Sequence, residues 1–516
     1  MLNIYNIILF IFYLFNVIFL FQINGHWGQY IDSEIIWPYN SLLILSDYKV
    51  EFIEFGSVYY ILLAIFLKIL NFINLSEIHN LEILLSSKNY SNTMQELFFY
   101  TRLFTSILGF IFLIMLKKIF FKITKSEIIS FILIILFFYS PGFIVSMSHS
   151  RADFVSVLFV IFCIYFLICF VEDKKENLNN LFLFFFFFNF AILTKLQVFF
   201  YFPWICLLVI FFCKKSNFSS KKFIYNNKIF YFIVIFLILI AFIYPLIYLR
   251  HTKLSILFLY YQLCSFNLLF FYYIKFYKIG ISKNNFFSLV MRYNFILLIV
   301  YFFCFNFFSN LFFLDDTLII KLTYLDPSSI LQFIDNKSLH KQNFTFNFDI
   351  ISSILSTFIY NIFKIIDFYF LSLNFQSILI YLILILFLFS FKKQLINIRI
   401  CTPIILIIFF MINFINVMRD SEVKPLYFIF SDFLLFIILA INLNFIKYKK
   451  TLQIFVYSSI IVAFFTFNIA NIKTTYYGYH TFFKNDKLKF WCNQQYVENF
   501  AKKLTTKFYE HCKLNY

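Results

Sequence analysis

Charged residues, glycine and proline are all scarce in this chain. Only 13% of its 516 residues are charged, and it has seven glycines and seven prolines, whereas 62% of the residues are hydrophobic and 87 are phenylalanine. A water-soluble protein of this composition could not cover its surface with polar groups. The nine cysteines show no metal-ligand spacing, and most lie inside apolar runs, where a thiol packs as a small apolar group. The composition excludes a soluble globular protein and predicts a membrane protein.

Long apolar runs recur from one end of the chain to the other. Each run of about 17–22 residues can cross about 30 Å of hydrocarbon as a helix, whereas barrel strands would alternate in polarity and be about half as long. The fold class expected is therefore all-α and polytopic, with about thirteen transmembrane helices. The first run, Ile4–Ile23, has neither a basic leading region nor a small-residue cleavage site, so we interpret it as a retained span.

Basic clusters between the apolar runs indicate the topology. Loops rich in lysine and arginine stay in the cytoplasm, so the net charge of +18 reflects topology rather than nucleic-acid binding. For the number of crossings to agree with these loops, Val58–Leu75 and Ile350–Leu373 must be external juxtamembrane helices. The N-terminus is then inside, and the C-terminus outside. We expect a transmembrane domain over residues 1–470, with a large external loop at 24–97, and a short extracytoplasmic tail over 471–516. The basic clusters are Lys117–Lys125, Asp173–Lys175, Lys214–Lys222, Lys275–Lys283, Lys392–Arg399 and Lys447–Lys450.

The external loop after the first run carries two acids, Asp32 and Glu34, in the segment "QYIDSEIIWPYN". The surrounding tryptophans and tyrosines are typical of an aromatic rim at the level of the lipid headgroups. A carboxylate held there and partly desolvated is a candidate general base or metal ligand. The alternative is that a long external loop simply contains acids.

A second acid, Asp153, begins an apolar run in "SHSRADFVSVLF". The pattern Ser-x-x-Asp predicts a helix start with Ser150 as N-cap, and the helix dipole favours a carboxylate at that position. His149 and Arg151 are its candidate solvated partners. Capping and a functional role are compatible.

Cations lie on the same predicted external side. Lys195 stands in the turn "ILTKLQVFF", against the positive-inside trend. Several cations converging at one membrane face would suit a lipid phosphate or pyrophosphate. For each cation taken singly, the alternative is an interfacial anchor that snorkels to the membrane surface. The other cations on this side are Arg102, Arg250, Arg419 and Lys424.

In their order and spacing, these motifs resemble the GT-C superfamily of polytopic glycosyltransferases, in its protein O-mannosyltransferase and aminoarabinose transferase branch. The resemblance covers about the first 215 residues: an acidic loop motif ("IDSEII"), a juxtamembrane helix, an arginine opening the second span ("YTRLF"), the second acid ("SHSRAD") and a "TK" turn before a proline-containing span. Two departures stand out. Ser33 separates the two acids of the loop motif, and the late arginine-tyrosine motif survives only as "MRDSEVKPLYFIF".

The resemblance implies a transfer of sugar, with inversion, from a polyprenyl-phosphate donor to a lipid, glycan or protein acceptor outside the cytoplasm. Asp32 or Glu34 would hold the catalytic place, as the general base or by orienting the acceptor, and Asp153 would position the acceptor or a divalent cation. Any divalent cation would be held by Asp32 and Asp153. The donor phosphate would be bound by Arg102, Lys195, Arg419 and Tyr427. The location implied is a bacterial inner membrane, with the site facing the periplasm.

Two other functions fit the composition. A secondary transporter or flippase would favour charged groups at mid-membrane, broken helices and inverted repeats, none of which is evident in the sequence. A membrane protein without activity is the third interpretation, and it would not bring Asp32, Asp153 and Lys195 around one cavity. In the polar tail, Cys492 and Cys512 could pair only if the tail is extracytoplasmic.

Overall fold

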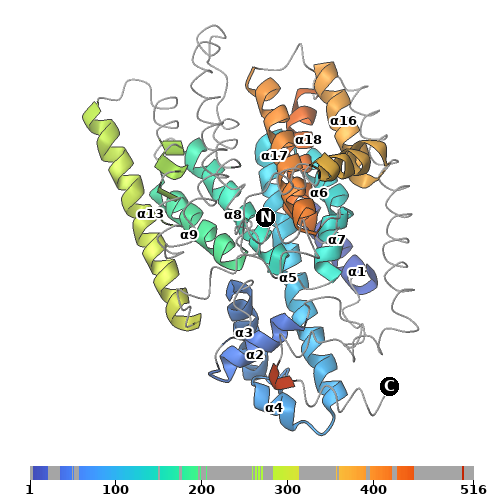
Figure 1. The fold of residues 1–516 in the computed structure, drawn as a ribbon, viewed down its shortest axis with the longest axis vertical. Helices are drawn as coiled ribbons and strands as arrows, with labels where there is room; N and C mark the ends of the chain where they lie inside the picture. Colours follow the sequence, from blue (N-terminus) through green and yellow to red (C-terminus); the bar gives the residue numbers. More distant parts are fainter. Residues whose placement is uncertain are drawn as a thin grey trace. The chain divides into compact units, whose positions relative to one another are not determined.

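The computed structural model describes residues 4–20, 35–48, 57–148, 152–173, 177–195, 283–312, 359–372, 374–390, 396–420, 427–446 and 502–504, together with isolated positions at 50, between 198 and 270, and at 356. Every element in these ranges is helical and none is a strand (Figure 1). The all-α expectation is therefore confirmed for the described residues.

The described helices include candidate membrane spans. Two helices are long and apolar enough to cross a bilayer, or up to four if each of two bent helix pairs counts as one span. Large apolar side chains are exposed on several helices, among them Phe15 (61%), Phe295 (64%) and Leu388 (71%). Large apolar side chains exposed on apolar helices of this kind suit a lipid surrounding. The membrane character is thus supported, while the count of about thirteen spans stays a prediction.

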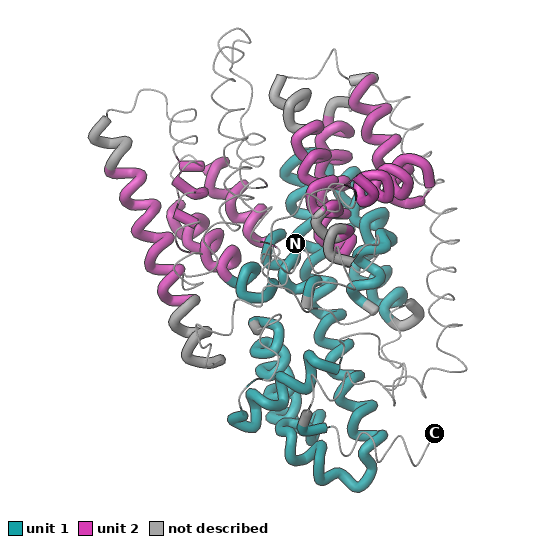
Figure 2. The backbone as a smooth tube through the Cα atoms, viewed as in Figure 1, with its two compact units in different colours: residues 1–161, 190–196, 446–516 teal, residues 162–189, 197–445 magenta. Residues whose placement is uncertain are grey.

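The chain divides into two compact units (Figure 2). Unit 1 comprises residues 1–161, 190–196 and 446–516, and unit 2 comprises residues 162–189 and 197–445. The boundary at residue 470 that the sequence suggested stays a prediction, because it lies outside the described residues.

Unit 1 contains seven complete α-helices among its described residues. They are α1 (Ile4–Leu20), α2 (Ile36–Leu45), α3 (Ser57–Phe72), α4 (Leu81–Ser86), α5 (Tyr90–Thr124), α6 (Glu127–Phe138) and α7 (Pro141–Ser148), followed by the start of α8 (Ala152–Glu172) and the end of α9 (Leu178–Thr194) and, near the C-terminus, by the short η5 (Lys502–Leu504).

Helix α5 is the central element of this unit. Its 35 residues span about 52 Å, which exceeds the thickness of a bilayer, so one end must project beyond the hydrocarbon. The Asn89 side chain accepts from the backbone N–H of Asn92 and starts the helix at Tyr90, twelve residues before the arginine that was expected to open this span. Arg102 therefore lies well inside α5.

Helices α1 and α3 each form a hydrogen bond with the same part of α5. The Tyr13 hydroxyl of α1 donates to the carbonyl of Ser106 at 2.6 Å, and the Tyr59 hydroxyl of α3 lies 3.1 Å from Thr105 Oγ1. At Gly109, an added Cβ would overlap both the Met147 sulfur of α7 and the Tyr13 hydroxyl. Glycine therefore fits this position, whereas a larger residue would require the Met147 and Tyr13 side chains to move.

Local signals explain where the helices end. Asp47 and Asn74 adopt positive φ (55° and 56°) after α2 and α3. The N–H groups of Tyr48 and Leu75 then donate back to Leu43 and Leu70, each at 2.9 Å, which closes both helices with a Schellman-type turn. Between α6 and α7, Pro141 follows a 63° break, because the residue before a proline is disfavoured in helical geometry.

Helix α3 coincides with the juxtamembrane helix expected at Val58–Leu75. Ile65, Ile69 and Phe72 lie on one face at helical spacing and are 51%, 52% and 86% exposed. An apolar stripe of this kind suits a helix lying in the membrane interface. Its placement at the membrane surface stays a prediction.

Unit 2 holds most of α8 and α9, and it also contains α13 (Lys283–Phe312), η3 (Asp367–Leu371), α16 (Phe375–Ser390), α17 (Ile396–Asp420) and α18 (Ile429–Ile446). The helix Ile359–Leu371 bends by 73° into Phe375–Leu388. This bend follows the segment that the sequence placed in a juxtamembrane helix.

Candidate functional site

Helices α8 and α9 form an antiparallel hairpin. The rings of Phe162 and Phe187 stack with centroids 4.6 Å apart, and those of Phe159 and Phe190 meet at 5.6 Å. Residues nearer the start of α8 therefore contact residues nearer the end of α9. The first turn of α8 and the residue after α9 consequently lie at the same end of the hairpin.

At that end, Asp153 and Lys195 form a buried ion pair. Lys195 Nζ lies 2.8 Å from Asp153 Oδ1, and the two side chains are 4% and 0% exposed. Both residues belong to unit 1. The structure therefore brings together two of the residues selected from the sequence, 42 positions apart in the chain.

The pair is matched to the backbone dipoles of its own helices. Asp153 stands in the first turn of α8, where the partial positive charge of the helix N-terminus favours a carboxylate. The Lys195 backbone N–H donates to the carbonyl of Ala191 at 2.9 Å, so the ammonium follows the last turn of α9, where a cation is favoured. Each charge would be stabilised at its position even before the two helices meet.

Among the described residues, Lys195 is an ion-pair partner of Asp153. The expected partners His149 and Arg151 and the expected cap Ser150 lie outside the described residues, so those expectations stay predictions. An ammonium at 2.8 Å also neutralises the carboxylate, so a divalent cation at Asp153 would stand beside a like charge. The possible cation site of Asp32 and Asp153 stays a prediction, because Asp32 lies outside the described residues.

Arg102 is buried on α5, with 5% of its surface exposed. Its guanidinium carbon lies 5.5 Å from the centroid of the Phe98 ring, one turn earlier in the same helix. Thr101, Thr105 and Ser106 flank it and are also buried, and each donates its hydroxyl to the backbone carbonyl four residues before it. Arg102 is thus held in an enclosed, partly polar stretch of α5, as a cation should be when it is removed from water.

The remaining expected site residues are described less fully. Asp32 and Glu34 lie outside the described residues, directly before α2, which begins at Ile36. Arg419 is in the last turn of α17, and Tyr427 is 6% exposed just before α18. These last two belong to unit 2 and are described with that unit alone.

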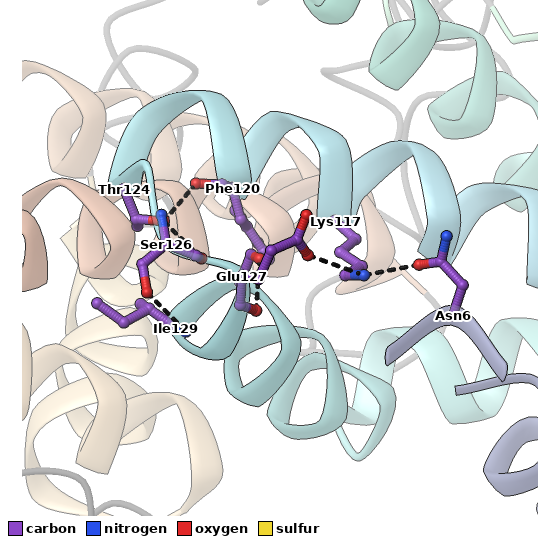
Figure 3. Close-up of polar contacts among 8 residues, drawn as sticks. Asn6, Lys117, Phe120, Thr124, Ser126, Glu127 and Ile129 are labelled. Atoms are coloured by element: carbon purple, nitrogen blue, oxygen red, sulfur yellow. Dashed lines mark hydrogen bonds and ion pairs between the residues drawn. The ribbon is translucent and has the colours of Figure 1, made fainter. Parts of the chain in front are cut away.

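A second ion pair, which the sequence reasoning did not select, joins α5 to α6 (Figure 3). Lys117 Nζ lies 3.2 Å from Glu127 Oε2 and donates to Asn6 Oδ1 of α1 at 2.6 Å. Ser126 caps α6 by accepting from the Ile129 N–H at 3.4 Å. The sequence signal was present in "KSEII", a serine and an acid at a helix start, but the pattern did not show which lysine would meet the acid.

Unit 2 contains another buried acid that was not anticipated. Asp432, in the first turn of α18, is 1% exposed and accepts from Gln376 Nε2 of α16 at 3.3 Å. Beside it, the hydroxyl of Ser431 lies 3.3 Å from Asn413 Oδ1 of α17. Buried hydrogen bonds between helices of this kind hold membrane bundles together.

No protein-family model, curated protein or solved structure matches the chain. The functional argument therefore depends on the residues and on their geometry.

Proposed function

We propose that the chain is a membrane glycosyltransferase that moves a sugar from a polyprenyl-phosphate donor to an extracytoplasmic lipid, glycan or protein acceptor. The observation that carries the proposal is the Asp153–Lys195 pair at the open end of the α8–α9 hairpin. A cation in a mostly apolar protein has a large desolvation cost, so its retention there indicates a use for its charge. The motif order of the first 215 residues supports the same activity.

In this mechanism, Lys195 binds the donor phosphate while it stays paired with Asp153. An ammonium has three N–H donors, so one can face the carboxylate while another contacts a phosphate oxygen. Asp153 then acts as a positioning residue that keeps the ammonium charged and oriented. Arg102 is the second candidate cation for the phosphate, and Arg419 and Tyr427 are further candidates.

The reaction is a single displacement at the anomeric carbon. Asp32 or Glu34 accepts the proton of the acceptor hydroxyl, whose oxygen forms a bond to the anomeric carbon. The bond from that carbon to the phosphate oxygen breaks, and its electron pair leaves with the polyprenyl phosphate. The lysine stabilises the negative charge that grows on this leaving group, and the configuration of the sugar inverts.

The test is the consumption of a panel of polyprenyl-phosphate monosaccharides by the purified protein in liposomes that also contain a mixture of lipid, glycan and protein acceptors. Asp32→Asn should lower the rate of transfer about a hundredfold or more, as loss of a general base does, and Glu34→Gln should do less. The matched control is Asp47→Asn, in the turn after α2, where the positive φ also suits asparagine. If no donor is consumed, the proposal is wrong; if Glu34→Gln is inactive and Asp32→Asn active, Glu34 is the base.

A transporter or flippase is the second candidate, because the structure adds one observation in its favour. Both bent helix pairs interrupt an apolar segment, and Asp432 is buried near the 73° bend in unit 2 through its contact with Gln376. Broken helices with buried polar groups are typical of transporter binding sites. Uptake of a labelled solute into proteoliposomes that is lost in Asp432→Asn, without donor consumption, would favour this function.

A further inference from the structure

Helices α16, α17 and α18 of unit 2 lie side by side (Figure 1) and are joined through buried polar side chains. Gln376 Nε2 of α16 donates to Asp432 Oδ1 of α18 at 3.3 Å. The Ser431 hydroxyl of α18 lies 3.3 Å from Asn413 Oδ1 of α17. These four side chains belong to residues that are each 2% exposed or less. The starts of α16 and α18 therefore meet α17 in one enclosed polar region.

The turn that leads into α16 is held by its own polar side chains. Asn374 accepts from the Ser377 N–H at 2.8 Å and donates to the Phe368 carbonyl at 2.6 Å. Before the turn, the chain forms the π-helical segment η3, whose last turn is closed by the Ser372 N–H donating to the Asp367 carbonyl at 2.8 Å. Such π-helical turns are frequent at functional sites. The 73° bend is thus fixed by hydrogen bonds, which also fix the position of η3.

Tyr369, in η3, differs from the polar residues of the turn. It is fully buried, and its ring meets those of Phe409 and Phe410 of α17, with centroids 5.2 and 5.9 Å away. Its hydroxyl has no hydrogen-bond partner among the residues that the structure describes. The Asp432 carboxylate is close enough for its charge to act on this hydroxyl. A buried hydroxyl without a partner lowers stability unless another group fills the position beside it.

We propose that Tyr369 and Asp432 share a hydroxyl-binding site, in which one bound O–H group accepts a hydrogen bond from the tyrosine and donates one to the carboxylate. A hydroxyl suits this position because it donates and accepts at once, whereas an ionised carboxylate only accepts. The bound group belongs either to water or to a neutral polyol such as a sugar. An anion would stand beside the like charge of Asp432. The site lies within unit 2 and does not depend on the glycosyltransferase activity proposed above.

The site is tested by Tyr369→Phe in the full-length protein in detergent, because this change removes the hydroxyl and keeps the ring. If the hydroxyl bonds to a bound O–H group, its loss should shift the unfolding equilibrium about two- to tenfold toward the unfolded state. If the hydroxyl is unpaired, its removal should leave stability unchanged or raise it. Tyr360→Phe is the matched control, with no change expected, because Tyr360 is 59% exposed in the same bent segment.

A double variant tests whether the two side chains share the bound group. Combining Tyr369→Phe with Asp432→Asn should shift the equilibrium by less than the product of the two single shifts, because either change alone already breaks the bridge. Independent effects of the two substitutions would overturn the shared site.

Millimolar glucose or mannose distinguishes the two sources of the hydroxyl. If either sugar stabilises the wild type but not Tyr369→Phe, the site binds a polyol. If neither sugar has an effect and Tyr369→Phe is still destabilised, the site holds water. Unchanged or higher stability of Tyr369→Phe, together with no stabilisation of the wild type by either sugar, would overturn the proposal. None of these measurements needs a sugar donor, so their outcome is separate from that of the transferase assay.

Discussion

Replacing Lys195 by methionine should leave the Asp153 carboxylate buried without its cation. Removing one partner of a buried ion pair costs about 3–5 kcal/mol, because the remaining charge loses its compensation while it stays desolvated. If Lys195 merely anchored the protein at the membrane surface, its replacement would lower the free energy of unfolding by about 0–1 kcal/mol. The exposures of 4% and 0% place this pair in the first class.

The double variant distinguishes the pair from a general effect of mutation. Asp153→Asn combined with Lys195→Met removes both charges and should recover most of the loss, since neutral replacement of a buried pair is often tolerated. The coupling free energy expected is about 3 kcal/mol, equivalent to about 150-fold in the unfolding equilibrium. Exchanging the two residues, Asp153→Lys with Lys195→Asp, should recover less, because each charge would then oppose the dipole of its helix at a cost of about 0.3–1 kcal/mol.

The assay is reversible unfolding in mixed micelles with increasing dodecyl sulfate, followed by circular dichroism. Lys68→Met is the matched control, because Lys68 is exposed on α3 and its replacement should change stability by about 0.5 kcal/mol or less. If Lys195→Met is no more destabilising than Lys68→Met, or if Asp153→Asn fails to rescue it, the pair does not stabilise the hairpin as argued.

Three further predictions concern other parts of the chain. Gly109→Ala should lower the free energy of unfolding by about 1–3 kcal/mol through overlap with the Met147 sulfur and the Tyr13 hydroxyl; unchanged stability in the same unfolding assay would contradict the close approach of α1, α5 and α7. Lys117→Met should lower the free energy of unfolding more than Glu127→Gln does, because the lysine side chain is 6% exposed and the acid 36%, and because glutamine keeps a hydrogen-bonding oxygen. Equal decreases in the same unfolding assay would contradict this ranking. Cys492 should react with a membrane-impermeant thiol reagent in intact cells, since the tail is predicted outside; labelling only after the membrane is broken would overturn the topology.

The sequence by itself determined the class of protein and much of its local structure. Composition required a membrane protein, and the length of the apolar runs required helices, because a lipid environment leaves no other way to satisfy the backbone. A helix start close to Asp153 and a turn at Thr194 and Lys195 were both expected, and α8 begins at Ala152 and α9 ends at Thr194, since a helix begins and ends through signals that are local in sequence. The extension of α5 to Tyr90 was not, because Asn89 supplied a cap ahead of the expected apolar start.

Only the tertiary structure decided which of these residues meet. The packing register between helices decides these contacts. It pairs Asp153 with Lys195 and Lys117 with Glu127, and it places the Lys503 N–H within hydrogen-bond distance of the Tyr39 hydroxyl. Phenylalanine is so frequent in this chain that many packing registers would bury a similar apolar area. The hydrophobic periodicity of one helix also does not indicate which residues of a neighbouring helix it will contact. The charges select the register, because a buried carboxylate or ammonium is tolerated only where its partner stands within a few ångströms.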